Sequence, residues 1–237
     1  QNSSVGYIKL ERFAHGAGRE VRDAIKTLQS EREIEGLILD LRDNPGGLLD
    51  QAVQIADVFL ESGVIVTTRG REKENDMFFE AHPDKPRYRF PTVVLVNGGS
   101  ASASEIVAGA LQDQERAVIM GTQSFGKGSV QTIIPLSDDS GLRLTTAKYY
   151  TPNGTSIQAR GIIPDIEVQP IEIKEVKDPV HFREKDLKNH FNIEGSVPGI
   201  EQQEAPVLDE QTRSDFQLMR ALDLLKGWRI FQGLVAA

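Results

Sequence analysis

The sequence contains no cysteine in its 237 residues, which excludes a disulfide framework, a thiolate metal site and a cysteine nucleophile. No apolar run approaches the roughly 18 residues that a membrane-spanning helix needs. The four histidines lie in no recognisable catalytic or metal-binding motif: His15, His82, His181 and His190. The chain starts without methionine, a basic start or an apolar signal core, so we expect a fragment or processed form that lacks an upstream targeting segment.

The overall charge is acidic. A formal net charge of −8 argues against nucleic acid or an anionic membrane as the main partner. The composition, 39% hydrophobic and 26% charged, is ordinary for a protein with a sizeable buried core. The length suits one globular domain with a tail, or one domain and a small second one.

Apolar runs alternate with helical spacing over the first 170 residues. Continuous apolar runs predict buried strands, and the 3.6-residue period predicts helices between them. The expected strands are Val5–Leu10, Leu37–Leu41, Val64–Thr68, Thr92–Val96, Val118–Met120, Val130–Leu136 and Leu142–Tyr149, and the expected helices are Gly18–Gln29, Leu48–Leu60 and Ala103–Asp113. Arg69–Phe90, which is polar and contains two prolines, is expected to be a loop or an irregular excursion. The pattern predicts an α/β fold with crossover connections around a buried sheet.

The character of the chain changes after Pro170, where we place a domain boundary between residues 1–170 and a tail, 171–237. Glu184–Phe191 is a candidate short helix within a charged, weakly periodic stretch. Asp209–Leu225 has a continuous apolar face and predicts a helix. This helix either forms an oligomerisation element or packs on the core of its own chain.

A serine-rich turn, Asn97–Glu105, follows one buried strand and opens a helix. Ser102 would lie at the helix N-terminus, where free amides favour developing negative charge. The Ala103 amide could then donate to an oxyanion, and the Gly46-Gly47 turn after a neighbouring strand could supply a second donor. Serine is also a favoured helix cap, so capping is the alternative reading of Ser100, Ser102 and Ser104.

A second glycine-rich loop carries a lysine. Gly121–Lys127 matches the G-x-x-x-x-G-K spacing of a phosphate-binding loop. That interpretation fails because Gly128 stands where the motif needs Ser or Thr, and because a strand rather than a helix is expected next. A solvated surface lysine is the ordinary alternative. Small, apolar surroundings would instead favour a neutral Lys127 that can act as a base, with Gln131 orienting the amine without adding a negative charge.

Three motifs together resemble those of the C-terminal processing (tail-specific) peptidases. They are Asp40–Gly47, Gly99–Glu105 and Phe125–Gln131, and supporting matches extend from Val5 to Val168 in the family's order. The tail is also similar to that of Gram-negative bacterial members. The resemblance implies a crotonase-like or Clp-protease-like sheet wrapped by helices, with a partly helical C-terminal tail.

The resemblance also implies a serine endopeptidase that acts near substrate C-termini. Ser102 would be the nucleophile, Lys127 the general base and Gln131 the residue that orients the lysine. The oxyanion hole would comprise the amides of Ala103 and Gly46, whereas Ser100 and Ser104 would be structural. No metal or cofactor is implied.

The resemblance further predicts the partners and the location. Protein or peptide substrates with apolar C-termini are expected, in the bacterial periplasm or cell envelope. Self-association as a homo-oligomer rests on the apolar helix over residues 209–225, and packing of that helix on its own core is the alternative. Family members usually carry a PDZ domain before the strand matched by residues 5–10, and this chain begins at that point, so substrate capture or activation is expected to need a PDZ domain or partner outside it. A non-catalytic or resting-state binding module of the same fold is the alternative function.

Overall fold

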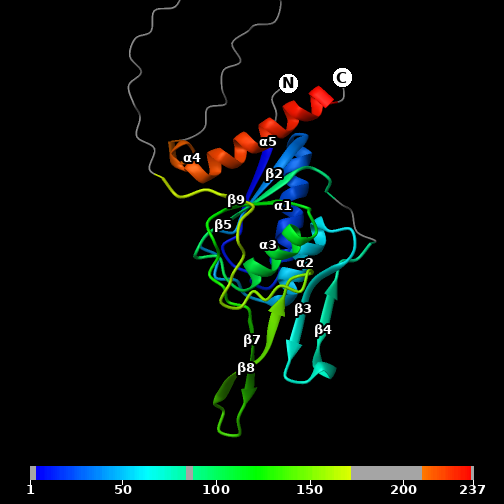
Figure 1. Cartoon of the computed structure of the whole chain (residues 1–237), viewed down its shortest axis with the longest axis vertical. Coiled ribbons are helices and arrows are strands. Elements are labelled where there is room, and N and C mark those ends of the chain that lie inside the picture. Colours follow the sequence, from blue (N-terminus) through cyan, green and yellow to red (C-terminus); the bar gives the residue numbers. More distant parts are fainter. Residues whose placement is uncertain (1–3, 84–87, 172–209, 236–237) are drawn as a thin grey trace, which may run out of the picture.

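Continuous apolar runs build the centre of the molecule as a five-stranded parallel sheet. In the computed structural model (Figure 1), which describes residues 4–83, 88–171 and 210–235, the strand order of this sheet is β1-β2-β5-β6-β9. The bounds are β1 Ser4–Lys9, β2 Ile34–Asp40, β5 Thr92–Val96, β6 Val118–Gly121 and β9 Ile166–Glu167. The predicted α/β class with a buried parallel sheet is confirmed, and β9 is a short addition that the apolar pattern does not predict.

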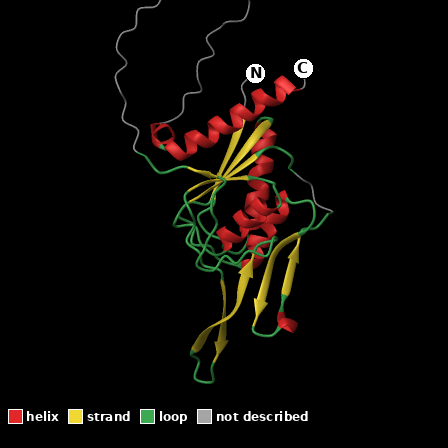
Figure 2. Cartoon of the chain, viewed as in Figure 1, coloured by secondary structure: helices red, strands yellow, loops and turns green. Residues whose placement is uncertain are grey.

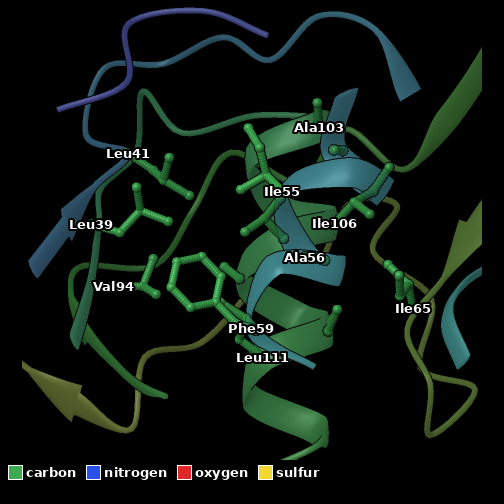
Figure 3. Packing of buried hydrophobic residues seen from close by; sticks show 14 of the residues in the cluster. Leu39, Leu41, Ile55, Ala56, Phe59, Ile65, Val94, Ala103, Ile106 and Leu111 are labelled. Carbon is green, nitrogen blue, oxygen red and sulfur yellow. The ribbon is translucent and has the colours of Figure 1, made fainter. Parts of the chain in front are cut away.

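Side chains alternate between the two faces of this sheet, as pleated strands require. On one face, Leu39 and Val94 pack with helix residues such as Phe59 and Leu111, which Figure 3 shows pointing toward one another. Three helices cover this face, and all three match the predicted ones: α1 Ala17–Glu31, α2 Leu49–Phe59 and α3 Ala103–Asp113.

The C-terminal helix covers the opposite face. Leu218, Ala221 and Leu225 pack against the sheet in a second buried cluster with Ile38, Val93, Leu95, Met120 and Val168. Gly36 of β2 permits this close approach, because a Cβ there would lie only 3.1 Å from a Leu225 methyl carbon. The tail therefore contributes to the covering of the sheet.

The predicted helix over residues 209–225 is wrong in its extent. The structure has a short helix α4, Glu210–Ser214, and then a longer helix α5, Phe216–Val235. The two helices are separated at Asp215. Its carboxylate accepts a hydrogen bond from the Leu218 amide and so caps the N-terminus of α5. Gly227 and Gly233 weaken a helix without ending it, so α5 continues past the predicted end. The candidate helix over residues 184–191 lies outside the described residues.

A second sheet projects from the body as two antiparallel ribbons (Figure 2). Its order is β4-β3-β8-β7, with bounds β3 Val64–Gly70, β4 Met77–Glu80, β7 Ser129–Pro135 and β8 Gly141–Tyr150. The expectation of a loop over residues 69–90 is wrong in part, because that stretch contains β4 and a 3₁₀ turn, Lys73–Asn75. Pairing with β3 supplies β4 with backbone hydrogen bonds that its short sequence does not signal.

Candidate active site

The three predicted motifs meet at one edge of the parallel sheet. The glycine turn follows β2, the serine turn follows β5 and the lysine loop follows β6, and these three strands are neighbours. Parallel neighbours end at the same edge, where ligand and catalytic sites of α/β sheets usually lie. The structure thus brings together segments separated by more than seventy residues of sequence.

The serine turn presents Ser102 at the first turn of α3 in a strained conformation. Ser102 has φ 56° and ψ −109°, a region that costs a non-glycine residue about 1–3 kcal/mol and that concentrates at functional sites. Ser102 is partly accessible, whereas Ser100 and Ser104 are fully buried. Their hydroxyls donate to backbone oxygens, Ser100 to Leu41 at 2.7 Å and Ser104 to Asn44 at 2.9 Å. Ser100 and Ser104 are therefore structural in this geometry.

The glycine turn lies directly against the serine turn. Gly46 has φ 94°, and a Cβ at this position would lie 2.5 Å from the Ala101 oxygen, 2.8 Å from the Ala103 nitrogen and 3.0 Å from Ser102 Cβ. A side chain at position 46 would therefore collide with the backbone of the serine turn. The structure brings Gly46, Ser102 and Ala103 into contact, as the proposed oxyanion hole requires.

The two predicted oxyanion donors differ in their present partners. Among the described residues, the Ala103 amide makes no hydrogen bond, so this donor is available at the helix N-terminus. The Gly46 amide donates instead to the Asn44 side-chain oxygen at 2.9 Å. Within the described part of the chain, the Gly47 amide has no acceptor. The glycine turn thus offers one paired and one unpaired amide.

A buried carboxylate joins the serine turn to the lysine loop. Glu105 Oε2 accepts the Ser102 amide at 2.7 Å and the Lys127 amide at 2.9 Å. Glu105 Oε1 accepts the Ser124 hydroxyl and the Gly126 amide, both at 2.6 Å. Glu105 is fully buried, so these four bonds are what stabilises its carboxylate there. The backbones that carry the candidate nucleophile and base share a single carboxylate oxygen.

The side chain of Lys127 is half-buried and, among the described residues, forms no hydrogen bond to Ser102 or Gln131. Gln131 is exposed on β7, where it pairs with Thr145 of β8. The structure therefore joins Ser102 and Lys127 through their backbones and does not bring the Gln131 carboxamide onto the amine. β7 begins at Ser129, so a strand follows the loop where a phosphate-binding loop would need a helix.

Glu105 is a site residue whose role the sequence motifs do not predict. Its signal in the sequence is the spacing Ser102-x-x-Glu105 before an apolar helix, which is typical of a capping box. That spacing predicts the bond from the Ser102 amide. It does not predict the three bonds to the lysine loop.

In residues 4–83, 88–171 and 210–235, no cluster of three or more His, Asp or Glu side chains could hold a metal ion. No helix within those ranges is long and apolar enough to span a membrane.

Comparison with known proteins identifies the family. Residues 4–168 match peptidase family S41. The chain belongs to this family. A carboxy-terminal-processing protease of Bartonella bacilliformis is 50% identical over 228 residues, which cover 94% of this chain and 52% of the relative. A carboxyl-terminal-processing protease of Synechocystis is 45% identical over 181 residues, covering 74% of this chain and 41% of the relative.

A solved S41 structure shares the fold. The photosystem II D1 C-terminal processing protease superposes with a TM-score of 0.65 at 37% sequence identity, covering 70% of this chain and 42% of that one. The S41 chain described here thus spans about half or less of the length of these relatives. The resemblance to C-terminal processing peptidases and the expected fold are confirmed.

Proposed function

We propose that this chain is the catalytic core of a serine endopeptidase that cleaves protein substrates near their C-termini through Ser102 and Lys127. The observation that carries the proposal is the shared Glu105 oxygen, which holds the Ser102 and Lys127 amides at 2.7 and 2.9 Å. The names of the relatives, C-terminal processing proteases, support the substrate class. Protein or peptide substrates with apolar C-termini, and a periplasmic or envelope location, belong to the same proposal.

In the proposed reaction, neutral Lys127 takes the Ser102 proton as the hydroxyl oxygen attacks the scissile carbonyl carbon. The Ala103 amide and an amide of the Gly46-Gly47 turn stabilise the oxyanion, each contributing on the order of 3 kcal/mol. The lysine ammonium then protonates the leaving amine. Water, deprotonated by the same lysine, hydrolyses the acyl-enzyme and releases Ser102. Gln131 would support the lysine once a substrate or partner has brought the two side chains together.

A resting state is the second candidate. It is favoured because, among the described residues, the Lys127 amine forms no hydrogen bond to Ser102 or Gln131, and because Gln131 is exposed. In that case the chain would have the residues of the peptidase but would require a PDZ domain, a partner or self-association to align them. A fluorophosphonate probe, which reacts with activated serines, separates the two candidates.

The test compares labelling and hydrolysis of a denatured protein by wild type and by Ser102→Ala and Lys127→Ala. Both variants should lose labelling and hydrolysis while keeping the wild-type melting temperature within a few degrees. Ser30→Ala and Lys26→Ala, exposed positions on α1, serve as matched controls and should behave as wild type. Undiminished hydrolysis by either site variant would refute the dyad. Labelling of wild type only after a partner is added would indicate the resting state.

A further inference from the structure

Residues 41–47, which we call the 41–47 turn, include the glycine turn. Arg42 belongs to this turn, and its side chain bonds to residues outside the active site. All five N–H groups of its guanidinium are directed at acceptors. Nε and one Nη donate to the two oxygens of Asp40 at 2.9 and 2.6 Å. The other contacts are to Asp215 at 2.9 and 2.7 Å and to Gln217 at 3.1 Å, both at the start of α5. An arginine so fully bonded has one defined position.

Asp215 has two roles in this arrangement. Its Oδ1 accepts the Leu218 amide at 3.0 Å and so caps α5, and both its oxygens accept from Arg42. Burial alone would raise the pKa of Asp215, but the hydrogen bonds from Arg42 and the Leu218 amide outweigh it and the pKa is lowered. The carboxylate is therefore bound in its charged form.

Gln217 extends the same contact to the far edge of the sheet. It is buried, its Oε1 accepts from Arg42 at 3.1 Å, and its Nε2 donates to the Val168 oxygen at 2.7 Å. Val168 follows β9 directly and donates its amide to the Gly121 oxygen at the end of β6. The beginning of α5 thus contacts residues that follow β2 and β9, and Val168 links it to the end of β6, at the edge that carries the site.

The turn that Arg42 holds is bonded directly to the serine turn. The Leu41 oxygen accepts the Ser100 hydroxyl at 2.7 Å. The Asn44 oxygen accepts the Ala101 amide at 3.0 Å and the Ser104 hydroxyl at 2.9 Å. A displacement of Arg42 would therefore move the residues on either side of it, and with them the acceptors that position the serine turn.

We propose that Asp215 is a positioning residue: by clamping Arg42 from the C-terminal helix, it fixes the 41–47 turn against Ser102. The inference concerns catalysis only if the proposed peptidase function is correct, whereas its structural part can be tested without activity. It assigns a catalytic-support role to a residue 173 positions away from Arg42 and outside residues 4–168, the stretch that matches peptidase family S41.

The test uses Asp215→Asn in the full chain, because asparagine caps helices as well as aspartate does but cannot form the charged bidentate pair. The control is Asp223→Asn, which removes an exposed aspartate of the same helix whose carboxylate lies 3.8 Å from Arg220. Amide hydrogen exchange is measured for residues 41–47 and, as a check on folding, for α5. We expect exchange of the turn to accelerate about tenfold or more in Asp215→Asn, with α5 unchanged, and neither segment to change in Asp223→Asn.

Hydrolysis of a denatured protein is measured on the same variants. In Asp215→Asn, kcat should fall roughly tenfold to a hundredfold while KM stays within about twofold, because small displacements of catalytic groups act on the transition state. Should α5 also exchange faster, Asp215→Ser, another good cap, repeats the comparison. A double variant, Arg42→Gln with Asp215→Asn, should lose no more activity than Arg42→Gln alone, since both residues act through one contact.

Three outcomes decide the inference. Unchanged exchange of the 41–47 turn in both cap-retaining variants overturns it. Faster exchange with unchanged kcat overturns the link to catalysis. If the turn exchanges faster in Asp215→Asn but the wild type hydrolyses no substrate, the structural clamp is supported and the proposed function is not. Failure of the clamp and failure of the proposed function are therefore distinguishable.

Discussion

Replacing Glu105 with glutamine removes one acceptor oxygen from the centre of the site while keeping the size of the side chain. In the wild type, Oε2 serves the Ser102 and Lys127 amides and Oε1 serves the Ser124 hydroxyl and the Gly126 amide. An amide NH₂ group cannot accept a hydrogen bond from either pair. In the variant, therefore, the side-chain oxygen can serve only one of the two pairs of donors.

The less costly orientation places the new NH₂ group toward Ser124 and Gly126. The Ser124 hydroxyl can rotate and accept, whereas a backbone amide cannot, so this orientation leaves one backbone amide unpaired, that of Gly126. The opposite orientation would leave two amides unpaired, those of Ser102 and Lys127. An unpaired buried donor costs about 1–3 kcal/mol, and the remaining bonds lose their charge assistance, so Glu105→Gln should destabilise the fold by about 2–4 kcal/mol.

Urea unfolding measures this change in the free energy of unfolding. The rate of labelling by a fluorophosphonate probe measures the reactivity of Ser102. Because the oxygen kept by glutamine still serves Ser102 and Lys127, labelling should fall less in Glu105→Gln than in Glu105→Ala, which removes all four bonds. Glu115→Gln, at an exposed position after α3, is the matched control and should change stability by less than about 0.5 kcal/mol. If Glu105→Gln were as stable as this control, the carboxylate would not be the structural link described above.

Two further predictions concern neighbouring groups. Gly46→Ala should abolish probe labelling and lower the free energy of unfolding in urea by about 2–4 kcal/mol, because the new Cβ would lie 2.5 Å from the Ala101 oxygen and φ is positive. Gly98→Ala is the control, since a Cβ at Gly98 has nothing within 4 Å; equal losses of stability in the two variants would contradict the argument. Burial and the hydrogen bond to Asp40 raise the pKa of Tyr7 from 10.0 to about 12. The unfolded chain thus releases this proton at lower pH than the folded chain, so wild-type stability should fall more steeply between pH 10 and 12 than that of Tyr7→Phe. Parallel stability curves for the two proteins over this range would refute the shift.

Short-range patterns in the sequence account for most of the fold. The continuous apolar run Leu37–Leu41 predicts a buried strand, and in the structure both faces of β2 are covered. The helix over residues 103–113 follows from its apolar period and its capping spacing. The expected loop over residues 69–90 hides β4, whose pairing depends on β3 rather than on its own pattern. The predicted helix end near residue 225 is wrong because α5 continues through Gly227 and Gly233, which weaken a helix without ending it.

The contacts that organise the candidate site are long-range, and this is why the sequence does not reveal them. Glu105 reaches residues 19 to 22 positions away in the lysine loop, and Arg42 reaches Asp215 across 173 positions. A glutamate at the third position of a helix predicts a cap whether or not a loop folds over it. An aspartate before a helix likewise predicts a cap whether or not an arginine faces it. Only the sheet order brings these groups together.

The pairing of the Gly46 amide with Asn44 does not exclude Gly46 as an oxyanion donor, as the energies involved show. A neutral hydrogen bond of this kind contributes about 0.5–1.5 kcal/mol, whereas a donor to an oxyanion contributes on the order of 3 kcal/mol in the transition state. Exchanging the bond to Asn44 for a bond to the oxyanion is therefore favourable by about 2 kcal/mol in the transition state. Asn44 would therefore keep this amide paired and the turn ordered until charge develops on the substrate. That role requires the turn to stay in place while its internal bond is exchanged, which is what a fixed Arg42 supplies from outside.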